Sequence, residues 1–458
     1  MLDINQLLIS SDATIRDALD RINQNHLGLI FLQSEDHRVV GVATDGDIRR
    51  GLLGGLALDA PINNCANFNF TSAPASTPRE LLLKQLDQRI RAIPLLNERD
   101  ELVSVVSRDS LPLPQESRVY SRARSPVRIS FGGGGSDLTH YFSRDKDGAV
   151  INATISLFAH ATLRVRTDQK IFIYSNDLAK GIEADSLSDL LVLGGSFGLV
   201  QSILKTIRPE FGFELFLNSD FPMSSGLGGS ASVAASVIGC FNELRVDKWD
   251  LHELAEIAYQ AERHYLGIEG GWQDQYATVF GGFNFMEFRM EQNIVHPLRL
   301  SLDILHELEE SLVLCDTGLK HDSGGIHEDQ REQMKVDSVL AAVKSNVDLT
   351  YQIRNHLLRG RLLDFGRSLN EAWMYKRKFS KKISSEELDK IYDDALHNGA
   401  VGGKLLGAGA GGFFLFYVSP FRKFNLLQHL HEKGLKVHPF KFENKGLQTW
   451  SVRELGEI

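Results

Sequence analysis

Hydrophobic and polar positions follow the same order twice in the N-terminal part of the chain. Residues 14–48 show an amphipathic helix pattern, two short apolar runs separated by a polar turn, and the start of another helix. Residues 77–111 repeat this order in the same register, so that Ile30 aligns with Ile93. The pattern predicts two copies of one small helix–strand–strand–helix unit.

The second copy also carries the signals of a helix N-terminus. Thr77 can act as the N-cap, Pro78 suits the first helical position, and Glu80 would complete a capping box. Residues 111–118 follow with two prolines and polar side chains, which predict a short linker. Beyond it, glycine-rich loops alternate with apolar strands and amphipathic helices, as is typical of an α/β or α+β enzyme.

The most informative of these loops lies in residues 221–240, FPMSSGLGGSASVAASVIGC, between a strand-like stretch and a predicted helix. The glycines that can adopt positive φ and let backbone N–H groups approach a ligand are Gly226, Gly228 and Gly229. The helix N-terminus would add an anion site, and Ser230 and Ser232 could cap it or contact a phosphate or metal ion. Taken alone, the loop is equally well explained as an ordinary glycine-rich turn. A Walker A loop is excluded, because G-x-x-x-x-G-K-[ST] does not occur in the sequence.

Two further glycine-rich segments flank this loop in the sequence. Residues 125–141, SPVRISFGGGGSDLTHY, combine a predicted strand, four glycines and an aspartate. Residues 403–417, GKLLGAGAGGFFLFY, contain a G-x-G-x-x-G pattern. A dinucleotide-binding fingerprint needs a strand before the glycines and a helix after them. Here a helix-like segment, 386–397, precedes the loop and a strand follows it, so we reject that interpretation.

Composition narrows the classes of function. A chain of 458 residues is expected to form two or three domains, and a net charge of −9 argues against a nucleic-acid platform. The three cysteines are far apart and have no metal-site spacing, as expected in a reducing compartment. The N-terminus does not resemble a signal peptide, and no uninterrupted apolar stretch reaches about 18 residues. We therefore expect a cytoplasmic protein without a membrane span.

The string PMSSGLGGSAS closely resembles the central motif of the GHMP kinases, the superfamily of galactokinase, homoserine kinase and mevalonate kinase. The two flanking segments resemble the first and third motifs of that family and stand in the family's order. The resemblance implies an α+β (mixed α/β) fold with a two-lobed kinase. A ribosomal-S5-like N-terminal lobe is expected at 122–300 and a ferredoxin-like C-terminal lobe at 301–458, after a linker at 113–121.

The resemblance also implies ATP and Mg²⁺ as cofactors and assigns residues to them. The residues implied to bind ATP are Pro222, Ser224, Ser225, Gly226, Leu227, Gly228, Gly229, Ser230 and Ala231. Those implied to bind the acceptor are Gly133, Gly134, Gly135, Ser136, Asp137, Gly271 and Gly409. Ser230 and Glu262 match the Mg²⁺ ligands. Asp274 matches the aspartate beside the acceptor hydroxyl, and Arg128 would stabilise its charge and that of the transferring phosphoryl group.

Within this family, GWQDQYATVFGGFNF and SLNEAWMYKRKFSKKIS most resemble the D-glycero-D-manno-heptose 7-phosphate kinases. The resemblance implies phosphorylation of the anomeric hydroxyl of a sugar phosphate, with the α-1,7-bisphosphate as product. Basic residues at 376–378 could meet the substrate phosphate, although we prefer to interpret them as a solvated helix face. Lys320 and His321 stand where this branch often has an arginine. A fucokinase-like kinase of a non-phosphorylated hexose and a nucleotide sensor with a silent kinase fold stay open as alternatives.

The N-terminal repeat, residues 1–112, resembles a tandem pair of cystathionine-β-synthase-type (CBS) domains. Such pairs commonly bind adenine nucleotides, and Thr44 and Asp47 match the positions that contact the ribose. Ser107 and Ser110 occupy these positions in the second copy, so we expect at most one adenine-nucleotide or nucleotide-sugar effector per chain. A module for dimerisation or docking is an equal alternative. The expected partners are a sugar phosphate and a second copy of the chain, with no nucleic acid and no membrane.

Overall fold

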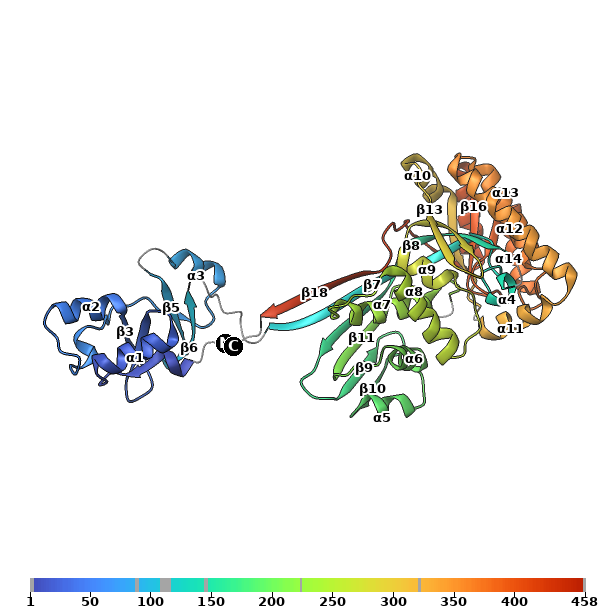
Figure 1. The fold of residues 1–458 in the computed structure, drawn as a ribbon. Coiled ribbons are helices and arrows are strands. Elements are labelled where there is room, and N and C mark those ends of the chain that lie inside the picture. The colour runs from blue at the N-terminus through green and yellow to red at the C-terminus, as the bar shows by residue number, and fades with distance from the viewer. Residues whose placement is uncertain are drawn as a thin grey trace. The chain divides into compact units, whose positions relative to one another are not determined.

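The computed structural model describes residues 4–86, 90–107, 117–143, 147–222, 225–319 and 323–455. The chain forms two compact units (Figure 1). One comprises Met1–Ser117 with Leu455–Ile458, and the other comprises Arg118–Glu454.

The first unit contains two small sheets of the same topology. In each sheet the first two strands are parallel and the third is antiparallel to the second. Irregularities in register fall at the equivalent positions Leu32/Gln33 and Leu95/Leu96, and Ile30 and Ile93 are both fully buried. The predicted repeat and its register are therefore confirmed in the described residues. The strands are β1 (Leu8–Ser10), β2 (Leu29–Gln33), β3 (Val39–Thr44), β4 (Ala73–Pro74), β5 (Ala92–Leu96) and β6 (Leu102–Ser107).

Two helices of this unit begin at threonine side-chain caps, Thr14 and Thr44, whereas the helix after Pro78 does not. The predicted cap at Thr77 is wrong, because Pro78 itself is the N-cap and no side chain caps the helix. Glu80 instead forms a 2.8 Å ion pair with Lys84 one turn later. The predicted helix start after β6 lies outside the described residues. The helices are η1 (Ile4–Leu7), α1 (Ile15–Asn25), α2 (Asp45–Leu53), η2 (Ile62–Asn64) and α3 (Arg79–Gln85).

The second unit is built on an eight-stranded sheet in the order β10-β9-β11-β8-β12-β13, with β7 paired to β8 and β18 paired to β7. Figure 1 shows β18, drawn in red, running beside β7. The C-terminal segment thus returns to the sheet of the first lobe. The strands are β7 (Ser117–Gly132), β8 (Gly148–Val165), β9 (Ile171–Ser175), β10 (Lys180–Ala184), β11 (Phe213–Ser219), β12 (Phe283–Phe288), β13 (Asn293–Pro297) and β18 (Gln448–Leu455).

Helices cover this sheet, and α7 is its central support. The helix packs on β8 and contacts α6, α8 and α9, so its small Ala, Ser and Gly residues are buried almost all round. Small residues allow this close approach to the sheet. The helices are α4 (Thr139–Phe142), α5 (Leu187–Val192), α6 (Gly198–Ile207), α7 (Gly229–Glu243), α8 (Leu251–Gln260), the π-helical turn η3 (Ala261–Tyr265) and α9 (Gln273–Phe280).

The second lobe has a four-stranded sheet in the order β15-β16-β14-β17, the strand order of a ferredoxin-like fold. The predicted mixed α+β class is confirmed. The strands are β14 (Leu312–Asp316), β15 (Ala400–Leu405), β16 (Phe413–Val418) and β17 (Lys436–His438). The helices are α10 (Leu302–Ser311), α11 (Ser323–Gln333), α12 (Asp337–Leu358), α13 (Leu362–Lys376), α14 (Glu386–His397) and α15 (Pro420–Glu432).

One strand of this lobe corrects the sequence interpretation. The third glycine loop follows β15 directly and leads into the antiparallel strand β16, so a strand as well as a helix precedes it. The rejection of a dinucleotide fold stands, because no helix follows the glycines. Across the described ranges, no helix is both long and apolar enough to cross a membrane.

Candidate active site

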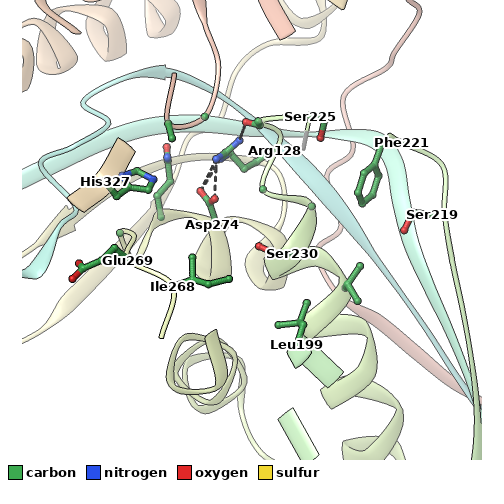
Figure 2. Close-up of a pocket in the computed structure, with 18 of the residues that line it drawn as sticks. Arg128, Leu199, Ser219, Phe221, Ser225, Ser230, Ile268, Glu269, Asp274 and His327 are labelled. Carbon is green, nitrogen blue, oxygen red and sulfur yellow. Dashed lines mark hydrogen bonds and ion pairs between the residues drawn. The ribbon is translucent and has the colours of Figure 1, made fainter. Parts of the chain in front are cut away.

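A cavity of about 530 Å³ is lined by residues of both lobes of the second unit. Figure 2 shows Arg128 and Asp274 near its middle. Glu269 and His327 lie on one side of this pair, and Leu199, Phe221 and Ser219 lie on the other. The cavity therefore has two ends that meet at one ion pair.

The predicted phosphate loop forms one wall of this cavity. Gly226 and Gly228 adopt positive φ, at 73° and 78°, whereas Gly229 is the first residue of α7. Gly228 is also the N-cap, and the helix has no side-chain cap, so its first N–H groups are not occupied by a capping side chain. The predicted ATP residues that line the cavity are Pro222, Ser225, Gly226, Gly228, Gly229 and Ser230.

The remaining residues predicted for ATP support the loop from behind. Leu227 and Ala231 are fully buried and do not line the cavity. The carbonyl oxygen of Leu227 accepts a 3.0 Å hydrogen bond from the backbone N–H of Arg128. Ser232, considered as a cap, is buried and donates its hydroxyl to the carbonyl oxygen of Ser125 at 2.7 Å. Ser224 lies outside the described residues.

The second and third glycine loops touch through their backbones. A Cβ atom at Gly407 would lie 2.5 Å from the Cα atom of Gly226, and one at Gly412 would lie 2.5 Å from the carbonyl oxygen of Ser225. Contacts this short exclude any side chain at Gly407 and Gly412. Gly407 and Ala408 line the cavity, whereas the predicted Gly409 packs against the backbone of Ile383. The two motifs therefore form one continuous wall.

Arg128 and Asp274 form the ion pair between the two ends of the cavity. Arg128 Nε and Nη2 donate to the two carboxylate oxygens of Asp274 at 2.8 and 2.9 Å, and Nη1 donates to the carbonyl oxygen of Gly226 at 2.6 Å. The Arg128 side chain is 4% exposed and that of Asp274 is 25% exposed. A bidentate pair of this kind fixes the orientation of the carboxylate as well as its charge.

Asp137 lies beside this pair and is held by backbone groups. Its oxygens accept from the N–H groups of Gly135 at 3.0 Å and Gln273 at 3.2 Å. Burial, together with the Asp274 carboxylate, raises the pKa of Asp137 above its ordinary value. A Cβ atom at Gly271 would overlap with the Asp137 carboxylate, so this position requires glycine.

The other residues predicted for the acceptor divide into two groups. Gly134, Gly135, Asp137 and Gly271 line the cavity. Gly133 and Ser136 instead shape the loop. Gly133 has a φ of 81° and no room for a side chain against Ala149, and the buried Ser136 hydroxyl donates to the carbonyl oxygen of Gly133 at 2.7 Å.

The two residues predicted to bind Mg²⁺ occupy different environments. Ser230 is exposed in the first turn of α7 and lines the cavity. Glu262 is 1% exposed in η3, accepts a hydrogen bond from Gln275 and does not line the cavity. Within the described part of the chain, no cluster of three His, Cys, Asp or Glu side chains could hold a metal. Ser230 fits Mg²⁺, which needs few protein ligands, but Glu262 does not fit as a direct ligand in this arrangement.

A buried lysine lines the cavity, and the preferred sequence interpretation misjudged its environment. From the sequence we preferred to interpret residues 376–378 as a solvated helix face, and that interpretation is wrong for Lys376. It is 7% exposed, lines the cavity and donates to the carbonyl oxygens of Leu405 and Gly407. Burial, with Arg128 nearby, lowers the pKa of Lys376 to about 8. The helical period of α13 could have placed Lys376 on the face of Trp373, whose side chain is fully buried.

Lys404 and His327 are further titratable groups near the cavity. Lys404 Nζ donates to the carbonyl oxygen of Ser130 at 2.8 Å, and burial lowers the pKa of Lys404 well below its usual value. Burial, with Arg263 and Lys376 nearby, lowers the pKa of His327 to about 4. His327 is therefore neutral near pH 7, and Arg263 and Lys376 are the cations whose charge acts on it. Lys320 and His321 lie outside the described residues.

In the first unit, Thr44 and Asp47 form a capping box at the start of α2. Thr44 Oγ1 donates to Asp47 Oδ2 at 2.6 Å and accepts from the Asp47 N–H at 3.2 Å. Thr14 and Asp17 form the same box at α1. The pair predicted to contact a ribose thus has a structural role that explains it without a ligand. Ser107 ends β6, and Ser110 lies outside the described residues.

Three family models match the chain. The model described as GHMP kinases N terminal domain matches residues 198–282, and the one described as GHMP kinases C terminal matches residues 354–433. A CBS domain matches residues 4–54.

Relatives extend these matches over most of the second unit. A D-glycero-alpha-D-manno-heptose 7-phosphate kinase from Campylobacter jejuni is 37% identical over 337 residues, which are 72% of this chain and 99% of that protein. The structure of a D-glycero-D-manno-heptose 1-phosphate kinase from Bacteroides thetaiotaomicron matches with a TM-score of 0.61 and 31% identity, covering 72% of this chain and 98% of that one. An L-fucokinase/L-fucose-1-P guanylyltransferase from Bacteroides fragilis is 28% identical over 69% of this chain, which spans 36% of that protein.

Proposed function

The chain belongs to the GHMP kinases, and from this membership we propose that it phosphorylates D-glycero-D-manno-heptose 7-phosphate with ATP. The proposed acceptor is the anomeric hydroxyl and the product is the α-1,7-bisphosphate, an intermediate for nucleotide-heptose and surface-glycan synthesis. Two of the similar proteins are named as heptose phosphate kinases, although the position of the phosphate in their names differs.

One observation carries the catalytic part of this proposal. The bidentate Arg128–Asp274 pair faces a cavity whose wall is formed by two glycine loops in backbone contact. Phosphoryl transfer needs alignment, charge neutralisation and a partner for the leaving proton. A fixed, partly exposed carboxylate beside a buried guanidinium supplies the last two of these requirements.

The chain's own residues divide the work between the two ends of the cavity. Gly226, Gly228 and the free N-terminus of α7 present N–H groups to an anion. Asp137 accepts hydrogen bonds from sugar hydroxyl groups, and Asp274 orients the acceptor hydroxyl and takes its proton. Arg128 keeps the Asp274 carboxylate in position, and Lys376 contributes positive charge beside it.

ATP with Mg²⁺, when bound, supplies the phosphoryl group and neutralises part of its charge. The described residues fit such a group at the glycine loop, where the helix N-terminus is uncapped and the exposed Ser230 hydroxyl can reach the metal. Glu262 is too enclosed to serve as the second ligand without a rearrangement of its Gln275 contact.

The direct test is turnover with a panel of sugars. We expect ADP formation with heptose 7-phosphate at a kcat/KM well above that with L-fucose or the unphosphorylated heptose. A preference for L-fucose would instead support the second candidate, a fucokinase-like activity, which the 28% identity to the Bacteroides fragilis protein favours. Absence of ADP formation with every sugar would support a silent nucleotide sensor.

For the first unit we propose that an adenine nucleotide or nucleotide-sugar binds near Thr44 and Asp47 and changes kinase activity. The match to a CBS domain at residues 4–54 supports this proposal. If the unit binds no ligand, the alternative proposal is that it forms a homodimer contact. Calorimetry on the full chain with a nucleotide panel, and light scattering, would distinguish these roles.

A further inference from the structure

Arg263 is a cation of the cavity without a carboxylate partner among the described residues. It lies in the π-helical turn η3 and lines the cavity. Its Nη1 donates to the carbonyl oxygen of Ile268 at 3.2 Å and its Nη2 to that of Gly271 at 3.4 Å. Its Nε is buried and has no hydrogen-bond partner in the described part of the chain. The positive charge is therefore positioned but not neutralised.

Adjacent backbone and aromatic groups fix the position of this guanidinium. A Cβ atom at Gly270 would lie 2.5 Å from Arg263 Cζ, so only glycine allows the guanidinium to lie against the backbone there. The ring of Tyr259 lies 5.8 Å from Arg263 Cζ and stacks on Trp272 with a centroid distance of 3.5 Å. This arrangement restricts the side chain before any ligand binds.

The glycine pair at 270–271 places Arg263 next to the carboxylate proposed to hold the sugar. Gly270 accommodates the Arg263 guanidinium, and Gly271 accommodates the Asp137 carboxylate. Arg263 and Asp137 both line the cavity, and Arg263 donates to the carbonyl oxygen of Ile268, which precedes the Glu269 labelled in Figure 2. The Asp137 carboxylate, which can accept from hydroxyl groups, and the Arg263 guanidinium, which can bind an anion, therefore lie against neighbouring residues of one wall.

The charges around Arg263 favour an anionic ligand. Glu269 also lines the cavity, but its carboxylate is paired with Arg331 Nη1 at 2.6 Å. Burial is the main cause that lowers the pKa of His327 to about 4, and the nearby Arg263 and Lys376 add to this shift. An uncompensated, partly desolvated guanidinium is costly unless a ligand supplies the counter-charge.

We propose that Arg263 binds the phosphate group that the acceptor sugar already carries, and so determines the choice of a phosphorylated over a non-phosphorylated sugar. This inference rests on the proposed function and deepens it. The phosphate accepts hydrogen bonds from the Arg263 guanidinium while Asp137 holds the sugar hydroxyl groups. Asp274, which lines the same cavity, would then receive the reacting hydroxyl.

The test compares heptose 7-phosphate with the same heptose lacking its phosphate. Arg263→Gln should raise KM for heptose 7-phosphate at least about tenfold, the loss expected for a hydrogen bond to a charged group. Its kcat, its KM for ATP and its kcat/KM for the unphosphorylated heptose should stay unchanged. Arg263→Lys keeps the charge and should recover part of the loss. Arg367→Gln, which removes an exposed arginine paired with Asp364, is the matched control.

Calorimetric binding of both sugars without ATP makes the result independent of turnover. Equal losses for both sugars in Arg263→Gln, or a raised KM for ATP, would overturn the inference. A wild-type protein that binds heptose 7-phosphate without phosphorylating it would contradict the proposed function, while the binding comparison would still decide the role of Arg263. A wild-type protein that binds neither sugar would contradict both.

Discussion

Arg128 and Asp274 are 146 positions apart in the chain and are joined by two hydrogen bonds of 2.8 and 2.9 Å. Gly228 lies directly against this pair, because a Cβ atom there would lie 3.3 Å from the Asp274 carboxylate and 3.4 Å from Arg128 Cζ. One residue from each of three distant segments therefore meets at a single point.

Asp274→Asn should lower kcat by at least about a hundredfold, because the proposed general base is lost. Nucleotide affinity should barely change, since the residue faces the acceptor. The measurement is steady-state kinetics combined with calorimetry of nucleotide binding. Asp220→Asn, at a surface carboxylate paired with His160, is the control and should keep full activity. Near-normal turnover of Asp274→Asn would remove this residue from the mechanism.

Gly228→Val should abolish ATP binding. A β-branched side chain resists the φ of 78° and would also press on Arg128 and Asp274. Gly434→Val is the control, because Gly434 has a similar φ of 74° but no atom within 4 Å of a Cβ there. Tight nucleotide binding by a folded Gly228→Val protein would show that the loop is only a turn.

Lys376 should give the reaction a pH dependence. Its pKa of about 8 means that the ammonium loses its proton as pH rises through about 8, which removes positive charge from the cavity. We expect kcat/KM of the wild type to fall above this pH, and the profile of Lys376→Met to be lower and flat there. If the pH profile of kcat/KM is the same in Lys376→Met as in the wild type, another group causes the decrease at high pH.

The lowered pKa of Lys376 also makes the stability of the fold depend on pH. The folded protein holds the Lys376 proton less tightly than the unfolded chain, so the unfolded state binds more protons between about pH 8 and the ordinary lysine value of 10.5. Across that interval this group should raise the free energy of unfolding as pH increases, by about 3 kcal/mol at most. Denaturant titrations of the wild type and Lys376→Met measure the difference. The two pH dependences should coincide below about pH 8.

Thr44→Ala and Thr14→Ala remove matching capping boxes in the first unit. Each should cost about 1 kcal/mol of stability of that unit. If Thr44 also contacts an effector, only Thr44→Ala should lose nucleotide binding in calorimetry, together with a regulatory effect of about 1–3 kcal/mol. Equal nucleotide binding by both variants would restrict Thr44 to its capping role.

The sequence predicted those parts of the site that depend on local pattern. The helix at 386–397 and the strand FFLFYV have the bounds that α14 and β16 show, because periodicity and glycine punctuation are local signals. The loop glycines were also predictable, since positive φ at Gly226 and Gly228 is a backbone property.

The parts that depend on tertiary packing could not be predicted in the same way. Lys376 belongs to a run of basic residues that is typical of a solvated helix face. It is buried because β15 and the third glycine loop, which come later in the chain, contact it. The turn η3 encloses Glu262 and directs Arg263 to the cavity, and no sequence signal marks a π-helical turn. The Thr77 cap failed because Pro78 took the N-cap position itself.

Product analysis after incubation with ATP and heptose 7-phosphate tests whether this chain is an anomeric kinase of a sugar phosphate. We expect one ADP to form for each bisphosphate, with phosphorus NMR showing the new phosphate coupled to the anomeric proton of the α anomer. Phosphorylation at another hydroxyl, or no product under conditions in which L-fucose is turned over, would contradict it.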